Sequence, residues 1–120
     1  MPARTLLSVE QRTRLFAMPT DLAAMARHYV LDTHDLALIR ARRRTSNRLG
    51  FAVQLCALRY PGRALEPEEI PPAPVLAFIA RQIDAEVELF ADYARRAETR
   101  REHLLELYKV LGLRARLKRG

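Results

Sequence analysis

The sequence has little cysteine, no tryptophan and no long apolar run among its 120 residues. The single cysteine, Cys56, excludes a disulfide framework and a thiolate metal cluster, and it fits a reducing compartment. Aromatic residues make up 7% of the chain, so we expect a core built mainly from Leu, Ala, Val and Ile. No segment approaches the ~20 apolar residues of a membrane-spanning helix. Glu10 and Arg12 come too early for a signal peptide. These absences predict a soluble, cytoplasmic protein.

Positive charge is abundant and unevenly placed. The formal net charge is +7, and residues 1–63 carry 11 basic and 4 acidic side chains, whereas residues 64–120 carry 10 of each. The whole excess therefore lies in the first half, and five arginines fall between residues 40 and 48. A genome rich in G and C favours arginine over lysine but does not explain this clustering. The asymmetry indicates a polyanionic partner.

The apolar residues recur at helical spacing almost throughout, and no stretch alternates as a strand would. We expect helices over about 8–17, 21–29, 33–44, 46–60, 74–83, 85–93 and 98–111. Ser8 and Gln11 fit a capping box, and Thr20, Thr33 and Asp84 are the expected caps of later helices. Gly112 should end the last helix.

The segment 46–60 is the most apolar of these helices and should lie at the centre of the fold. Leu49, Val53, Cys56 and Tyr60 form a stripe along it, and Gly50 marks either a close approach or a later start of regular helix. Leu22 should face inward from the helix predicted over 21–29. The proline-rich stretch 61–74 is the one clear connector.

These elements predict an all-α fold. Residues 1–44 would form a three-helix, helix-turn-helix-like unit, packed through the central apolar helix onto a C-terminal helical bundle within 45–120. In a helix-turn-helix, the second helix of the pair enters the major groove of DNA. Here His34 and Asp35 would begin that helix and face base edges, although any three-helix bundle also contains two helices joined by a tight turn.

The strongest binding candidate is the arginine-rich segment around residues 40–48. Guanidinium groups offer planar, bidentate donors to phosphate or guanine, and Thr and Asn side chains add hydrogen bonds to the nucleic-acid backbone. A solvated helix end would need only one or two cations, and more repel one another unless an anion is present. The predicted DNA-binding residues are Arg40, Arg42, Arg43, Arg44, Thr45, Asn47, Arg48 and His34.

A second basic cluster has two readings. Arg95, Arg96, Arg100 and Arg101 would contact a second stretch of DNA backbone. Glu98 and Glu102 are interleaved with them, so a self-paired, exposed helix face is the alternative.

Nothing in the sequence assembles an active site. The three histidines are His28, His34 and His103, and no two have the i, i+4 spacing of metal ligands. Cys56 lies on the apolar stripe, and there is no glycine-rich phosphate loop. We expect no catalytic residue, no metal and no cofactor.

One segment closely resembles a known family. The run from Arg48 to Arg63, RLGFAVQLCALRYPGR, is similar to the N-terminal region of Tn3-family transposases, and so are DLALIR (35–40), PVLAFIARQ (74–82) and DYARRAETRREH (92–103). The resemblance covers about residues 5–114. It implies a domain that recognises the terminal inverted repeats of a transposon in bacterial DNA, associated with the nucleoid. The acidic catalytic residues of such transposases lie toward the other end of a much longer chain, so this domain alone should not be an enzyme.

Two hypotheses follow. In the first, the chain binds double-stranded DNA at transposon ends as part of a transposase, whose remaining chain is its other partner. In the second, it is a protein-interaction module that dimerises the transposase or docks a host factor without touching DNA. RNA binding is a weaker alternative, because no run of aromatics for base stacking is apparent.

Overall fold

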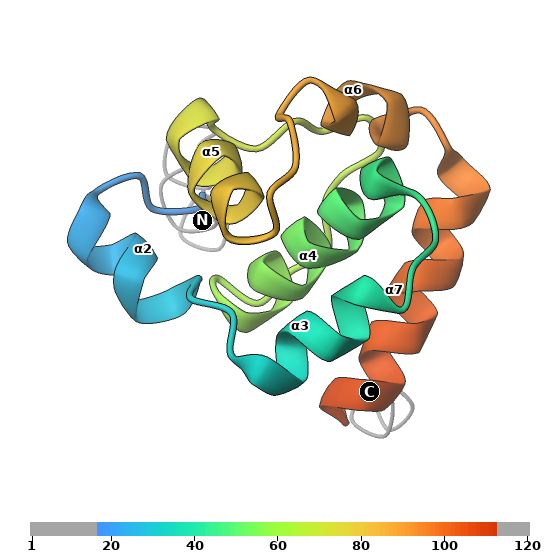
Figure 1. Ribbon diagram of the computed structural model, residues 1–120, viewed down its shortest axis with the longest axis horizontal. Helices are drawn as coiled ribbons and strands as arrows, with labels where there is room; N and C mark the ends of the chain where they lie inside the picture. The colour runs from blue at the N-terminus through green and yellow to red at the C-terminus, as the bar shows by residue number, and fades with distance from the viewer. Residues whose placement is uncertain (1–16, 113–120) are drawn as a thin grey trace, which may run out of the picture.

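The computed structural model describes residues 17–112, and every regular element in that part is a helix (Figure 1), which confirms the all-α class. The helices are α2 (Leu22–His28), α3 (Thr33–Arg40), α4 (Thr45–Arg59), α5 (Ala73–Gln82), α6 (Leu89–Ala94) and α7 (Ala97–Leu111). The helix and capping box predicted over residues 8–17 lie outside the described residues.

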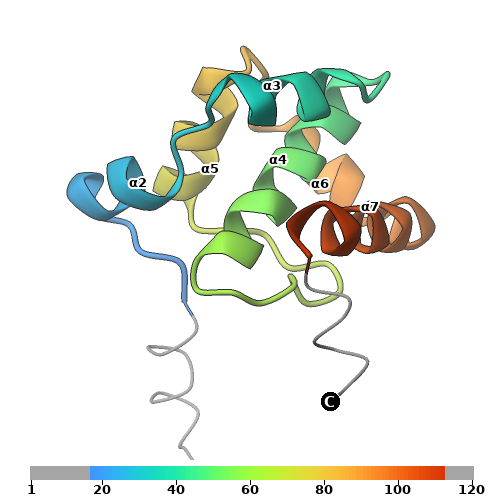
Figure 2. The same ribbon diagram turned by 90° about the horizontal axis from the view of Figure 1, so that it is seen from below.

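Helix α4 is the centre of the fold, as its apolar sequence predicts. It packs against α3, α5, α6 and α7. Figure 2 shows α4 between α5 on one side and α7 on the other, with α3 across it. Every residue from Leu49 to Leu58 is buried, because a helix surrounded on several sides is apolar on more than one face. The predicted boundary between the two units at residue 44 stays a prediction.

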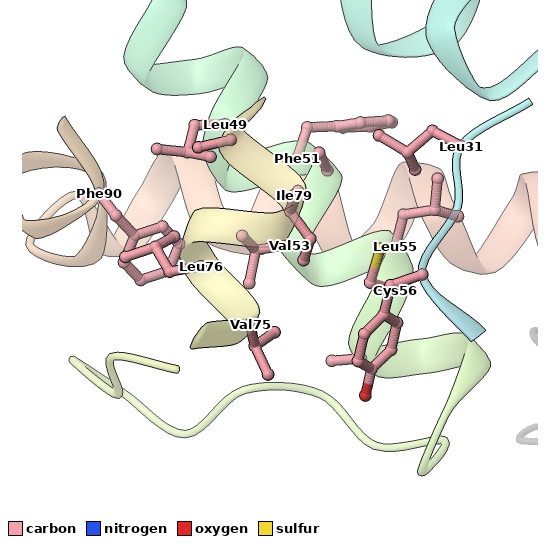
Figure 3. Packing of buried hydrophobic residues seen from close by; sticks show 14 of the residues in the cluster. Leu31, Leu49, Phe51, Val53, Leu55, Cys56, Val75, Leu76, Ile79 and Phe90 are labelled. Carbon is pink, nitrogen blue, oxygen red and sulfur yellow. The ribbon is translucent and has the colours of Figure 1, made fainter. Parts of the chain in front are cut away.

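The core forms where α4 meets α5 and α6 (Figure 3). Val53 of α4 lies close to Val75 and Ile79 of α5, and Phe90 of α6 lies beside Leu76, while Cys56 lies beside Leu55 within the same cluster. Each large apolar side chain buried here contributes about 1.5–3 kcal/mol. The predicted stripe is thereby confirmed, except at its last member.

Two residues predicted to face inward are exposed. Tyr60 is 42% exposed, because α4 ends at Arg59 and Tyr60 already has extended backbone, with φ of −159°. Leu22 is 69% exposed at the first position of α2. Tyr60 lies just past the end of α4 and Leu22 at the first position of α2, and at these two ends the side chains do not follow the buried face.

The helix caps differ from the prediction at three places. Asp21 caps α2 by accepting a hydrogen bond from Ala24 N at 3.1 Å. At α3, Asp32 accepts from Asp35 N at 2.8 Å while Asp35 accepts from Asp32 N at 2.9 Å, which is a reciprocal capping box. In both cases the aspartate beside the predicted threonine is the cap.

Asp84 was expected to begin a helix, but it closes the one before it. Its φ of 57° is in the left-handed region. Asp84 N donates to Arg81 O at 3.3 Å, and Ala85 N donates to Ala80 O at 3.0 Å. These two bonds are the Schellman pattern at a helix C-terminus, so α6 begins later, at Leu89.

Gly50 lies where α4 meets α6. A Cβ atom built on it would be 2.2 Å from the ring of Tyr93, a separation that no real side chain tolerates. The close approach is therefore the correct one of the two readings of Gly50. The neighbour is a ring from another helix, and regular α4 helix already includes Gly50.

The Tyr93 ring also belongs to a buried polar network that joins α4, α6 and α7. Gln54 Nε2 donates to Tyr93 Oη at 2.8 Å and to the Arg100 carbonyl at 3.1 Å. Tyr93 Oη and His103 Nδ1 are 2.8 Å apart. Each of these buried groups has a partner, which is what a stable interior requires.

This network predicts a pH dependence of stability. Burial and the nearby Arg42 charge lower the pKa of His103, while Glu106 opposes that shift. Below the unfolded pKa of about 6.5, the unfolded chain binds a proton that the folded chain resists. The free energy of unfolding therefore decreases as the pH is lowered, by at most about 1.4 kcal/mol per pH unit. Urea titrations between pH 7.5 and 5 measure this slope. His103→Gln should flatten it and the exposed His34→Gln should not; equal slopes in wild type and His103→Gln would contradict the prediction.

Candidate nucleic-acid interface

The predicted arginine cluster surrounds the turn between α3 and α4. Arg40 ends α3, Arg44 is the N-cap residue of α4, and the turn between them includes Arg42 and Arg43. In Figure 1 this connection passes in front of α7. We call residues 40–48 the arginine turn.

Three of its arginines are open to solvent. Arg40, Arg43 and Arg44 are exposed, and none forms an ion pair or side-chain hydrogen bond with any residue between 17 and 112. Thr45, beside them at the start of α4, is exposed as well. Like charges held this close repel one another unless an anion is bound, so the arginine turn is suited to a polyanion.

The other two arginines of the turn point back into the molecule. Arg42 forms a bidentate ion pair with Glu106 of α7, at 2.7 and 3.1 Å, and this partner holds the pKa of the Glu106 carboxyl below its usual value. Arg48 Nε donates to the Arg42 carbonyl at 2.7 Å. The sequence predicted the same DNA-binding role for all five arginines. In the structure, three are exposed, and the other two form contacts that hold the turn against α4 and α7.

The first turn of α4 adds to the positive potential. No side chain caps this helix, and the first intrahelical bond is donated by Arg48 N to Arg44 O at 2.9 Å. The amides of residues 45–47 precede that bond and have no backbone acceptor in the described part of the chain. Free N–H groups at a helix N-terminus favour an anion, and here they lie among the exposed guanidinium groups.

An open pocket of about 350 Å³ lies beside the turn, lined by Ala41, Arg42, Arg43, Asn47 and His103. Two atoms within its lining residues, Arg42 Nε and Asn47 Oδ1, are buried and have no hydrogen-bond partner in the described part of the chain. Asn47 is half-buried and is therefore less accessible to DNA than the exposed arginines.

At the start of α3, the predicted contact of His34 with DNA stays a prediction. His34 is exposed but lies six residues before Arg40, about 9 Å along the helix axis. Asp35 was expected to face base edges, and that expectation is wrong. It is 2% exposed and pairs with both terminal nitrogens of Arg59 in α4, which keeps its pKa below the usual value despite burial.

The second basic cluster is largely paired. Arg96 and Arg95 contact Asp92 at 2.9 and 3.7 Å, and Arg100 donates to the Ala94 carbonyl at 2.9 Å. Arg101 is exposed and has no ion pair among residues 17–112. The carboxylate partner is Asp92 of α6, not the interleaved glutamates of α7 that the sequence suggested.

The described residues offer no metal site, since no three His, Cys, Asp or Glu side chains gather there. Cys56 is buried, and burial raises the pKa of its thiol to about 12, so it lacks the thiolate of a nucleophile. Between residues 17 and 112, none of the helices has the length and apolar character needed to cross a membrane.

Glu106 and the buried Phe51 both hold Arg42 in place, and sequence reasoning missed both contacts. Glu106 fixes Arg42 from a distance of 64 residues, and Phe51 lies under the same guanidinium, 4.6 Å from ring centroid to Cζ. Helical spacing reports neighbours within one helix only, so no signal in the sequence indicated either contact.

Comparison with known proteins gives consistent matches. Residues 6–118 match the family described as "Domain of unknown function (DUF4158)". The chain is 46% identical over 114 residues to the transposase for transposon Tn3926 and 47% identical over 114 residues to that for Tn21, both from Escherichia coli. It is 45% identical over 113 residues to the transposase for Tn501 from Pseudomonas aeruginosa. These alignments cover 94–95% of this chain but only 11–12% of the relatives.

Proposed function

Since this chain belongs to the DUF4158 family, and its homologues are N-terminal regions of Tn3-family transposases, we propose that it binds double-stranded DNA at the terminal inverted repeats of a transposon. The homologues support a role in transposition. In this proposal the rest of a transposase chain carries the chemistry of strand transfer, and the domain supplies binding.

One observation carries the proposal: Arg40, Arg43 and Arg44 are exposed and lack carboxylate partners within residues 17–112, around the uncapped start of α4. Guanidinium groups and helix N-terminal amides are both common phosphate contacts, and they fix the position of a protein on a duplex. Arg101, which is exposed and has no ion pair among residues 17–112, serves as a candidate for an additional phosphate contact.

The surface composition favours a duplex over a single strand. Single-stranded nucleic acid is held by stacking of bases on exposed aromatic rings. Among residues 17–112 the one exposed aromatic is Tyr60. It follows the C-terminal end of α4, about 22 Å along the axis from the arginine turn, so the arginine turn itself has no exposed aromatic ring beside it among the described residues.

The test compares two variants with the same loss of charge. Arg43→Ala with Arg44→Ala removes two exposed arginines from the turn, and Arg27→Ala with Arg81→Ala removes two exposed arginines from α2 and α5. Both are titrated against duplex transposon ends and a scrambled duplex at several salt concentrations. We expect the turn variant to bind ~10–100-fold more weakly and to lower the salt slope by about 1.8, because each phosphate contact contributes ~0.9.

The control variant should keep most of the affinity and slope. A wild-type slope near zero, or equal losses in both variants, would overturn the proposal. Concentration-dependent oligomers without any mobility shift on duplex ends would instead support the interaction-module hypothesis. Thermal unfolding of each variant confirms that the fold is intact.

A further inference from the structure

We propose that Glu106 is a positioning residue for DNA binding: through Arg42 it holds the arginine turn in the shape that presents Arg40, Arg43 and Arg44 to phosphate. This inference rests on the proposed function and assigns a role to a side chain of α7 that carries the wrong charge for contact with DNA. It also divides the arginine turn into residues that bind and residues that brace.

The brace connects two helices far apart in sequence. Both terminal nitrogens of Arg42 donate to the two carboxylate oxygens of Glu106, at 2.7 and 3.1 Å. The Arg42 side chain is 17% exposed and that of Glu106 is 43% exposed. A bidentate pair fixes the orientation of both planar groups as well as their distance, so the pair sets where the turn lies relative to α7.

Arg42 is also bound to α4 from two directions. Its guanidinium carbon lies 4.6 Å from the centroid of the buried Phe51 ring, a cation–π contact. Its carbonyl accepts a hydrogen bond from Arg48 Nε at 2.7 Å. One residue therefore ties the turn to α4 by its carbonyl and its ring contact, and to α7 by its ion pair.

The backbone of the turn has little to hold it otherwise. Arg42 N donates to Ile39 O at 3.0 Å, and in the described residues the next backbone hydrogen bond along the chain is from Arg48 N to Arg44 O. Between these two bonds the path of the chain depends on side-chain contacts. Loss of the Arg42–Glu106 pair would leave Arg42 tied to α4 but no longer to α7 through this ion pair, so the segment that carries Arg43 and Arg44 would be held less firmly.

Direct contact of Arg42 with DNA is the competing reading, with Glu106 as a carboxylate that DNA must displace. The two readings predict opposite changes in DNA affinity when Glu106 is neutralised. Removal of a negative charge from a DNA-binding surface strengthens binding by simple electrostatics. A loss of affinity on neutralising Glu106 can therefore come only from its effect on the turn.

The experiment measures duplex affinity of Glu106→Gln beside Glu102→Gln, a matched control that removes an exposed carboxylate one turn earlier on α7. We expect Glu106→Gln to weaken binding about three- to tenfold, and Glu102→Gln to leave it unchanged or slightly tighter. Equal affinities of the two variants, or tighter binding by Glu106→Gln, would overturn the inference. Absence of binding by the wild-type chain would instead count against the proposed function.

A charge exchange supplies the rescue. Arg42→Glu combined with Glu106→Arg keeps the net charge and restores an ion pair between the turn and α7. Positioning predicts that the exchange binds at least threefold better than the combination of Arg42→Gln and Glu106→Gln, which has the same net charge but no ion pair; direct phosphate contact by Arg42 predicts no difference between them. If thermal unfolding shows that the exchange does not fold, Arg42→Gln, Glu106→Gln and their combination decide. Positioning then predicts that Glu106→Gln weakens wild type but has no further effect on Arg42→Gln, and additive losses would refute it.

Discussion

Gly50→Ala should lower the free energy of unfolding by about 2–4 kcal/mol, although alanine is the better helix former by about 1 kcal/mol. The new methyl carbon would be 2.2 Å from Cδ2 and Cε2 of the Tyr93 ring and 2.3 Å from its Cγ. Tyr93 is fully buried and hydrogen-bonded to Gln54 and near His103, so it cannot turn away without breaking the network. Overpacking of a dense interior typically costs about 1–3 kcal/mol, and more where nothing can move.

Urea denaturation of wild type, Gly50→Ala, Tyr93→Ala and the double variant measures this cost and its origin. Truncation of Tyr93 removes the ring that the methyl would meet, so Gly50→Ala should be nearly neutral in the Tyr93→Ala background. A Gly50→Ala chain more stable than wild type would show that helix propensity outweighs packing at this position.

Features that depend on neighbouring residues in the chain could be predicted from the sequence, whereas contacts between distant residues could not. The start of α4 near Thr45, its end before Pro61 and its central position were all predictable, because an apolar run and a local breaker are visible in the chain itself. The terminator Gly112 was predictable in the same way and has φ of 73°. The reason for Gly50 was not, since Tyr93 is 43 residues away and no local pattern reports which ring meets which backbone.

The candidate site shows the same limit more sharply. Clustering alone predicted a basic surface at residues 40–48, but it could not separate Arg42 from Arg43, which are neighbours with the same side chain. Glu106, on another helix, makes that distinction. Asp35 was expected to face base edges because it begins the presumed recognition helix of a helix-turn-helix. Its burial follows from its partner Arg59 of α4, 24 residues later. Partners supplied by tertiary structure decide which charges stay free.

Asp35→Ala should lower the free energy of unfolding by about 2–4 kcal/mol at neutral pH. The carboxylate accepts hydrogen bonds from both terminal nitrogens of Arg59 and from Asp32 N. Removal of one partner of a buried pair typically costs ~3–5 kcal/mol, and the 31% exposure of the Arg59 side chain lets water recover part of it. Loss of the capping box adds about 1 kcal/mol. Asp21→Ala, at an exposed cap without an ion pair among the described residues, is the control and should cost about 1 kcal/mol.

The difference in the free energy of unfolding between wild type and Asp35→Ala should depend on pH, and that dependence identifies its electrostatic part. Hydrogen bonds and the Arg59 charge outweigh burial and lower the pKa of Asp35 from its ordinary value of 3.8. A depressed folded pKa gives stability that is fully present above the unfolded pKa and is lost as pH falls through the folded value. Wild type and Asp35→Ala should therefore converge in urea titrations as pH drops below about 4, whereas Asp35→Asn, which keeps the size and an oxygen acceptor, should lie between them at pH 7. A gap that stays constant from pH 7 to pH 2 would assign the cost to packing and capping, because protonation would then leave the contribution of Asp35 untouched.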